Sequence, residues 1–148
     1  MADFNFVTNR IATGAALTNA DDVEQIYAAG INVVVDARAE FDDGPLFAGK
    51  PGIHYFWNPT KDDGTHKPTA YWQHTLGFVM PLLSSPHFKV LLHCSQGINR
   101  GPSNALCVMV AQGLDPVVAE MLIRRARPQV GLAYKENAIR ACQWLGYM

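Results

Sequence analysis

The fold expected for this chain is decided by one stretch, residues 89–113, which reads KVLLHCSQGINRGPSNALCVMVAQG. Its first part is apolar and predicts a buried strand over residues 90–94. A tight loop follows, in which Cys94 and Arg100 stand six positions apart. The apolar run 102–112 then predicts a helix. A strand, a tight loop and a helix N-terminus in direct succession are typical of an anion-binding loop in an α/β protein.

The loop has the features that a bound phosphate requires. The free N–H groups and the dipole of a helix N-terminus attract an anion. Gly97 suits a backbone that takes positive φ or approaches a ligand closely, and Pro102 suits the first helical position, where no N–H is needed. Arg100 offers a planar fork for two phosphate oxygens. A thiol in this setting is expected to be an ionised nucleophile, so the pattern predicts phosphoryl transfer to Cys94.

The motif His93-Cys94-x-x-Gly97-x-x-Arg100 resembles the signature of the cysteine-based protein tyrosine phosphatases. The continuation Arg100-Gly101-Pro102-Ser103 is similar to their small, atypical dual-specificity branch. The resemblance covers most of the chain from Asn9 onward, although only the signature is specific. It implies hydrolysis of a phosphate monoester through a cysteinyl-phosphate, with no cofactor or metal and with His93 orienting the loop. It also implies a phosphate-binding role for the remaining loop residues, which are Ser95, Gln96, Gly97, Ile98 and Asn99.

One residue departs from the family pattern. The family usually has Ser or Thr directly after the arginine, and that hydroxyl helps the thiolate to leave in the second step. This chain has Gly101 there, and the next hydroxyl along the chain belongs to Ser103. We therefore expect slow breakdown of the phosphoenzyme. A weakly active or inactive domain that binds phosphorylated ligands stays open as an alternative.

The resemblance also requires a general acid, an aspartate on a loop about thirty residues before the cysteine. Asp62 and Asp63 lie 32 and 31 positions before Cys94. The position of Tyr71, nine residues after Asp62, fits the small dual-specificity layout and favours Asp62, with Asp63 as the alternative. A well-placed acid contributes typically ~10²–10⁴ in rate.

The rest of the chain predicts strands that alternate with helices. We expect strands within 4–11 and at 31–35, 53–57 and 90–94; helices at 19–30, 69–83, 102–112, 115–126 and 135–145; and an irregular loop at 41–51. This order predicts an α/β fold in one domain over 1–148, with a central parallel or mixed sheet flanked by helices on both faces. Ligands bind such sheets at the carboxyl ends of the strands, where Cys94 and the Asp62 loop are expected. Asp36, Arg38 and Glu40 are expected to be loop and rim residues, with Arg38 a candidate for substrate contact.

Composition narrows the function classes. The 148 residues are 49% hydrophobic and 17% charged, with a formal net charge of −1, which is typical of a globular protein. No basic block predicts a nucleic-acid or membrane partner. The three cysteines lack metal-ligand spacing and fit a reducing cytoplasm. The start of the chain does not resemble a signal peptide. We expect a cytoplasmic monomer.

The uncharged interior of the loop bears on the substrate. It argues against highly phosphorylated inositol lipids and favours a phosphorylated protein, on tyrosine or also on serine and threonine. A nucleic-acid 5′-phosphate stays open. A rhodanese-type sulfurtransferase is the less favoured alternative, because His93 and Asp62 fit the phosphatase pattern. Structural roles are expected for the arginines of 124–127, and Tyr134, Lys135 and Asn137 are candidates for the far side of the pocket.

Overall fold

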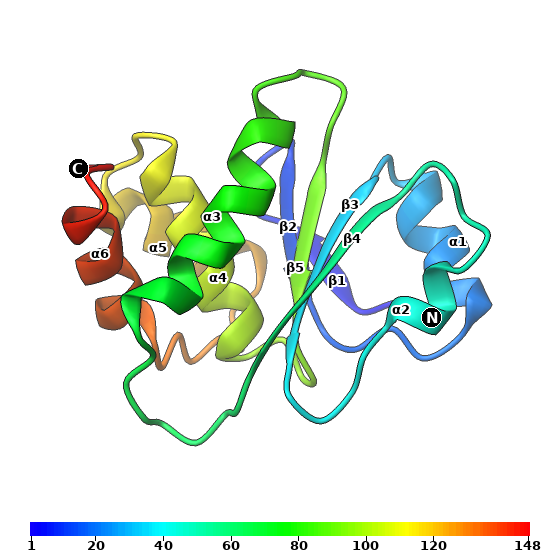
Figure 1. Cartoon of the computed structure of the whole chain (residues 1–148), viewed down its shortest axis with the longest axis horizontal. Helices are drawn as coiled ribbons and strands as arrows, with labels where there is room; N and C mark the ends of the chain where they lie inside the picture. The colour runs from blue at the N-terminus through cyan, green and yellow to red at the C-terminus, as the bar shows by residue number, and fades with distance from the viewer.

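A five-stranded mixed sheet runs through the centre of the molecule in the order β1-β2-β5-β3-β4 (Figure 1). The computed structural model describes residues 1–148. Four parallel strands form most of the sheet, with β1 antiparallel to β2 at one edge. The strands are β1 (Phe4–Phe6), β2 (Ile11–Gly14), β3 (Val33–Arg38), β4 (His54–Thr60) and β5 (Val90–His93). The carboxyl ends of the parallel strands meet along the lower edge in Figure 1.

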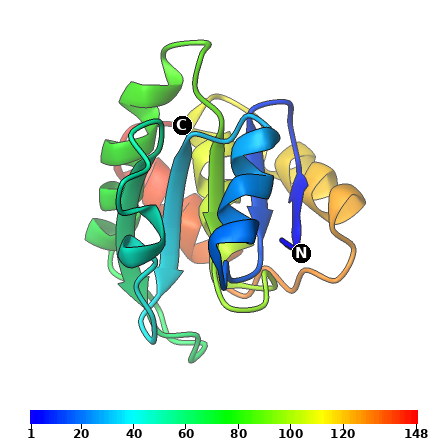
Figure 2. The same cartoon turned by 90° about the vertical axis from the view of Figure 1, so that its right-hand side faces the viewer.

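Helices cover both faces of the sheet, as the sequence predicted. On one face lie α3 (Thr69–Leu83), α4 (Arg100–Ala111), α5 (Pro116–Ala126) and α6 (Lys135–Trp144); on the other lie α1 (Ala20–Ala28) and the short α2 (Gly44–Phe47). Figure 2 shows α1 and α2 in front of the sheet. Val33 and Val35 pack in the core on the α4 side, whereas Val34 packs under α1. Successive strand side chains point to opposite faces, so this apolar strand supplies both cores.

The central helix α4 is buried along nearly its whole length. It begins at Arg100 rather than at Pro102, so that its first turn includes the end of the signature motif. Pro102 is therefore the third helical residue, where a backbone N–H still lacks a partner inside the helix and its loss costs little. The N-terminus of α4 points to the carboxyl ends of the strands (Figure 1).

Several boundaries differ from the predictions. β3 continues to Arg38, so Asp36 and Arg38 are buried strand residues and not rim residues. Pairing with β5 at Asp36 and with β4 at Asp36 and Arg38 stabilises this extension, although its charged residues do not continue the apolar run. β4 continues to Thr60, and the second N-terminal strand lies beyond the predicted one. The segment 41–51 contains α2 and is not wholly irregular. None of the helices combines the length and apolar character needed to span a bilayer.

Candidate active site

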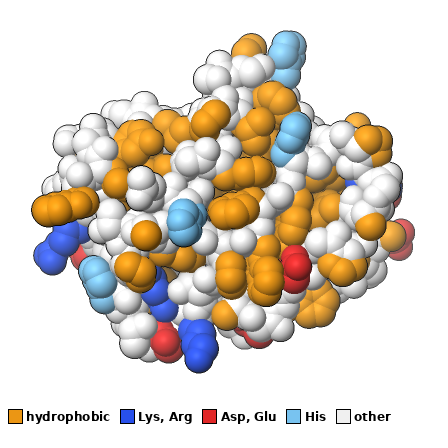
Figure 3. Space-filling model, in the orientation of Figure 1, with side chains coloured by type: hydrophobic (Ala, Val, Ile, Leu, Met, Phe, Trp, Pro, Cys, Tyr) orange, Lys and Arg blue, Asp and Glu red, His pale blue; other side chains and the backbone are white.

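A pocket of about 270 Å³ lies at the carboxyl ends of the parallel strands. The segments after β3, β4 and β5 all contribute to it. Its lining is Glu40, Asp62, Cys94, Ser95, Gln96, Ile98, Asn99 and Arg100. The structure thus brings together the three predicted catalytic residues and four of the five loop residues. Gly97, His93, Asp63 and Ser103 are not part of the lining. In Figure 3 hydrophobic side chains form patches over the middle of this face among uncharged side chains and backbone, and charged side chains of both signs appear along its lower edge.

The phosphate-binding loop is held from behind by Arg127. Gly97 has φ +68, and a Cβ there would lie 2.5 Å from Nη2 of Arg127 and 2.6 Å from the carbonyl carbon of Gly14. Arg127 is buried and donates Nε to the carbonyl of Gly97 at 2.8 Å and Nη2 to that of Gln96 at 3.0 Å. Only glycine fits this approach. The structural role predicted for the arginines of 124–127 is confirmed for Arg127.

Arg100 divides its five N–H groups between the protein and the pocket. Nη1 donates to Oε1 of Glu40 at 2.6 Å and to the carbonyl of Thr60 at 2.9 Å, while Nη2 donates to Oε2 of Glu40 at 2.8 Å. Nε is buried and has no partner. The two remaining hydrogens, on Nε and Nη2, belong to the guanidinium edge that binds carboxylates and phosphates bidentately. One edge of Arg100 is therefore fixed and the other is free for an oxyanion.

Glu40, which was expected only at the rim of the site, lines the pocket and binds Arg100. Its hydrogen bonds from Arg100 lower the pKa of Glu40 to about 2, because they stabilise the carboxylate. The side chain is about half exposed and closes one wall of the pocket. Nothing in the local sequence pairs Glu40 with an arginine 60 positions away.

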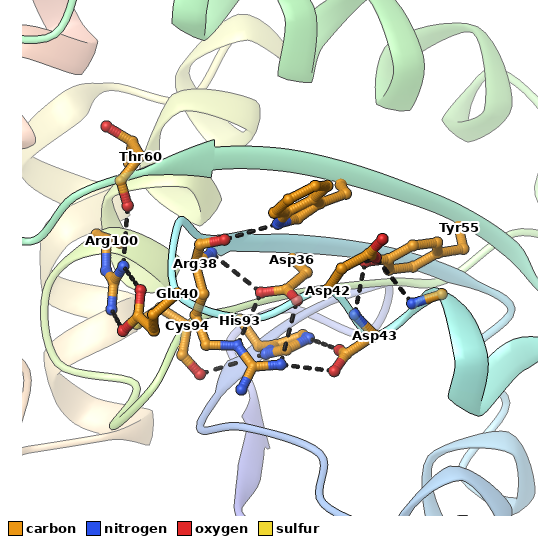
Figure 4. A network of polar contacts seen from close by, with 12 residues as sticks. Asp36, Arg38, Glu40, Asp42, Asp43, Tyr55, Thr60, His93, Cys94 and Arg100 are labelled. Carbon is orange, nitrogen blue, oxygen red and sulfur yellow. Dashed lines mark hydrogen bonds and ion pairs between the residues drawn. The ribbon is translucent and has the colours of Figure 1, made fainter.

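His93 lies beneath the loop in a buried network of charged groups (Figure 4). Its Nε2 contacts Oδ2 of Asp43 at 2.5 Å and its Nδ1 contacts the carbonyl of Cys94 at 3.3 Å. These two contacts fix the orientation of the imidazole ring. Through the Cys94 carbonyl, His93 is joined to the backbone at the start of the phosphate-binding loop.

Arg38 completes this network and does not contact the pocket. It donates Nε to Asp36 at 3.0 Å and Nη2 to Asp43 at 2.6 Å. Asp36, Asp43 and His93 have the donor types and spacing of a metal site. Here Arg38 donates to both carboxylates and His93 contacts Asp43, so these groups already have partners within the protein. The expectation that Arg38 contacts substrate is wrong, because its side chain is buried between these acids.

The two candidate acids occupy different places. Asp62 lines the pocket. Asp63 instead accepts hydrogen bonds from Thr65 and Lys67, which lower the pKa of Asp63 well below its usual range. Tyr134 contacts Asp62, and Asn137 holds the backbone of Lys67. Tyr134 and Asn137 therefore support the segment 61–67, here called the acid loop, from outside. The prediction that they line the pocket is wrong.

Solved structures of other proteins share this architecture. No model of a known protein family matches the chain. Human DUSP28 superposes with a TM-score of 0.80 at 19% identity, over 99% of this chain and 97% of its own. The chain has the fold of the small dual-specificity phosphatases. Tk-PTP in its active form (TM-score 0.74, 20% identity, 97% of this chain and 95% of its own) and PTPMT1 in complex with PI(5)P (0.77, 14%, 96% and 98%) share this dual-specificity phosphatase fold.

Within the dual-specificity phosphatase fold, the surroundings of Gly101 leave little room. A Cβ at this position would lie 3.0 Å from both the Leu92 carbonyl oxygen and the His93 Cα, and 3.1 Å from the Cys94 nitrogen. Ser103 is buried, and its Oγ accepts a hydrogen bond from the backbone N–H of Tyr134 at 3.3 Å. The Ser103 hydroxyl thus accepts a hydrogen bond from the backbone of Tyr134, whereas Gly101 has no hydroxyl.

Proposed function

We propose that the chain is a metal-independent phosphate monoester hydrolase of the dual-specificity phosphatase type. The observation that carries the proposal is the free edge of Arg100, buried and unpartnered at Nε, in the same pocket as Cys94 and Asp62. A bidentate donor beside a nucleophile and an acid is the arrangement that phosphoryl transfer requires. Arg100 and the N-terminus of α4 lie beside Cys94 at this pocket.

The reaction proceeds in two steps. The Cys94 thiolate attacks phosphorus while the phosphorus–oxygen bond to the leaving group breaks, and Asp62 gives its proton to the departing oxygen. Water then attacks the cysteinyl-phosphate and passes a proton to Asp62. The phosphorus–sulfur bond breaks, and the thiolate and inorganic phosphate are released. Arg100 and the loop N–H groups bind the equatorial oxygens in both steps.

The substrate we propose is a phosphorylated protein or another phosphate monoester, bound by a monomer. The loop side chains Ser95, Gln96, Ile98 and Asn99 are uncharged and give no site for several phosphates. A fold relative, PTPMT1, was solved in complex with PI(5)P, which supports binding of a phosphate ester in this kind of pocket.

Hydrolysis of 4-nitrophenyl phosphate in the presence of a metal chelator tests the proposal. We expect turnover in the wild type and its loss in Cys94→Ser. On phenyl phosphate, whose leaving group needs a proton, Asp62→Asn should lose the alkaline limb of the pH–rate profile, with a rate loss within the ~10²–10⁴ range of general acids. Asp63→Asn is the matched control and should keep both the alkaline limb and the wild-type rate. Activity that survives in Cys94→Ser would overturn the cysteine mechanism.

A second candidate, a phospho-ligand-binding domain with little turnover, is favoured by one observation. Position 101 has no hydroxyl for the departing thiolate. Rapid-quench kinetics separate the two functions. A slow phosphatase gives a burst of nitrophenol that matches the enzyme concentration, followed by slow turnover. Binding of the ester without any burst would support the binding domain instead.

A further inference from the structure

The phenol of Tyr134 contacts the acid loop at two points. The N–H of Gly64 donates to its Oη at 2.9 Å, and Oη lies 2.8 Å from Oδ1 of Asp62. A backbone N–H can only donate, so Oη accepts from Gly64 and directs its single hydrogen to Asp62. One hydroxyl therefore holds both the candidate acid and the turn that follows it.

Tyr134 is itself fixed relative to the phosphate-binding loop. Its backbone N–H donates to Ser103 on α4, the helix that begins at Arg100. The Nζ of Lys67 lies 4.9 Å from the centroid of its ring. The side chain is buried, and this burial, together with the hydrogen bond to Asp62, raises the pKa of Tyr134 above its usual value. The phenol thus stays protonated and remains a donor throughout the neutral range.

The far end of the acid loop is also fixed. Asn137, on α6, accepts from the backbone N–H of Lys67 at 2.6 Å and donates to its carbonyl at 2.9 Å. The Nζ of Lys67 donates to the Lys61 carbonyl at 2.6 Å, just before Asp62. Besides the Gly64 contact, the loop backbone is therefore held by contacts at Lys61 and Lys67 that do not involve the Tyr134 hydroxyl. Removing that hydroxyl should change the orientation of the carboxyl group more than the path of the loop.

We infer that Tyr134 is a positioning residue that decides which oxygen of Asp62 carries the transferable proton. With Oδ1 engaged by Tyr134, the proton of the acid form resides on Oδ2. Since Asp62 lines the pocket, Oδ2 is the oxygen left for the departing oxygen of the substrate. The inference rests on the proposed phosphatase function, which the closing experiment measures separately.

The leaving group provides a specific readout. A nitrophenolate departs without a proton, whereas a phenolate or alkoxide needs one in the transition state. Loss of the Tyr134 hydroxyl should therefore slow poor leaving groups more than good ones. A purely structural role would slow all substrates by the same factor.

The experiment compares kcat/KM of wild type, Tyr134→Phe and Asp62→Asn on 4-nitrophenyl phosphate, phenyl phosphate and a phosphoserine peptide. Tyr147→Phe, at an exposed tyrosine near the C-terminus, is the matched control. We expect Tyr134→Phe to lose about 10-fold on the two poorer leaving groups and less than about 2-fold on 4-nitrophenyl phosphate, as for one hydrogen bond to a charged group. For Asp62→Asn, the loss of kcat/KM should differ between poor and good leaving groups even more than for Tyr134→Phe.

Equal losses on all three substrates, or no loss, would overturn the inference while leaving the phosphatase function intact. A wild type that hydrolyses none of them would contradict the proposed function itself, and the inference with it. A crystal structure of the wild type with vanadate on Cys94 is independent of the variant's folding. Tyr134 on Oδ1 with Oδ2 at the apical oxygen would support the inference. A Tyr134 hydroxyl bound to vanadate would overturn it.

Discussion

At the scale of single residues, the orientation of Arg100 depends on Glu40. The carboxylate takes two of the five N–H groups and the Thr60 carbonyl takes a third, so the edge left over can face a phosphate. An arginine with all its donors free would have to lose rotamer freedom on each binding event. Glu40 therefore prepares the site before substrate arrives.

Glu40→Gln tests this contact through the pH dependence of stability. The folded-state pKa of Glu40, about 2, lies below its ordinary value of 4.5. Its stabilisation is therefore fully present above pH 4.5 and is lost as the pH falls toward 2. Urea denaturation should show a difference in free energy of unfolding between wild type and Glu40→Gln at pH 6 that shrinks below pH 4.5. A difference that stays constant down to pH 2 would contradict the assignment. Glu24→Gln, at a surface carboxylate on α1, controls for the change in net charge.

Gly101 allows close packing of α4 against the backbone of β5 and of Cys94. A side chain at position 101 would press on backbone atoms of β5 and of the phosphate-binding loop, which cannot move independently. We expect Gly101→Ser to lower the free energy of unfolding by about 1–3 kcal/mol, as for other overpacked sites. Gly77→Ser, in α3 where a Cβ meets open space, is the matched control. Thermal melts measure both, and equal melting temperatures would show that the loop tolerates a side chain.

At the scale of secondary-structure elements, the end of α5 stabilises the phosphate-binding loop. Arg127 donates to two loop carbonyls and also to Asp3, just before β1, and to Asn5 within β1. The loop, α5 and the N-terminal segment are thus joined through one buried side chain. The free N–H groups of the loop point to a common centre only while its carbonyls are held on the opposite side.

Arg127→Met should weaken both stability and oxyanion binding. Loss of these charge-assisted hydrogen bonds is expected to cost about 1.5–3 kcal/mol in free energy of unfolding. The inhibition constant for vanadate should rise in parallel, since the loop loses its support. Arg125→Met, at an exposed position of the same helix, should change neither quantity. Unchanged vanadate inhibition in Arg127→Met would limit Arg127 to a folding role.

At the scale of the whole molecule, an oxyanion in the pocket should stabilise the fold. The pocket is built from segments after three strands and from the N-terminus of α4, so binding opposes unfolding of all of them. At a tungstate concentration 100 times its Kd, mass action predicts about 2.7 kcal/mol of stabilisation. A thermal melt of the wild type should shift upward by several degrees, and Arg100→Ala should not shift. An equal shift in Arg100→Ala would place the anion elsewhere.

The local sequence determined much of this protein. The order of strand, loop and helix around Cys94 was correctly predicted. The helical spacing gave the bounds of α3, and the start at Asp115-Pro116 and the stop at Arg127-Pro128 gave those of α5. These features depend on neighbours within a few residues, so a local pattern contains them. The extension of β3 through Asp36 to Arg38 was not predicted. Asp36 and Arg38 are buried there because Arg38 pairs with Asp36 and Asp43, and Asp43 is in turn held by His93, 50 positions away.

The tertiary structure alone decided how the site residues are oriented. Glu40 and Arg100 are 60 positions apart, Asp43 and His93 are 50 apart, and Asp62 and Tyr134 are 72 apart. The sequence supplied these side chains but not their pairing, because hydrogen-bond geometry is set by how strands and helices pack together. The residue types of the nucleophile, the anion-binding arginine and the acid were therefore readable from the chain. Which edge of Arg100 and which oxygen of Asp62 stay free was fixed by contacts that only the folded chain brings together.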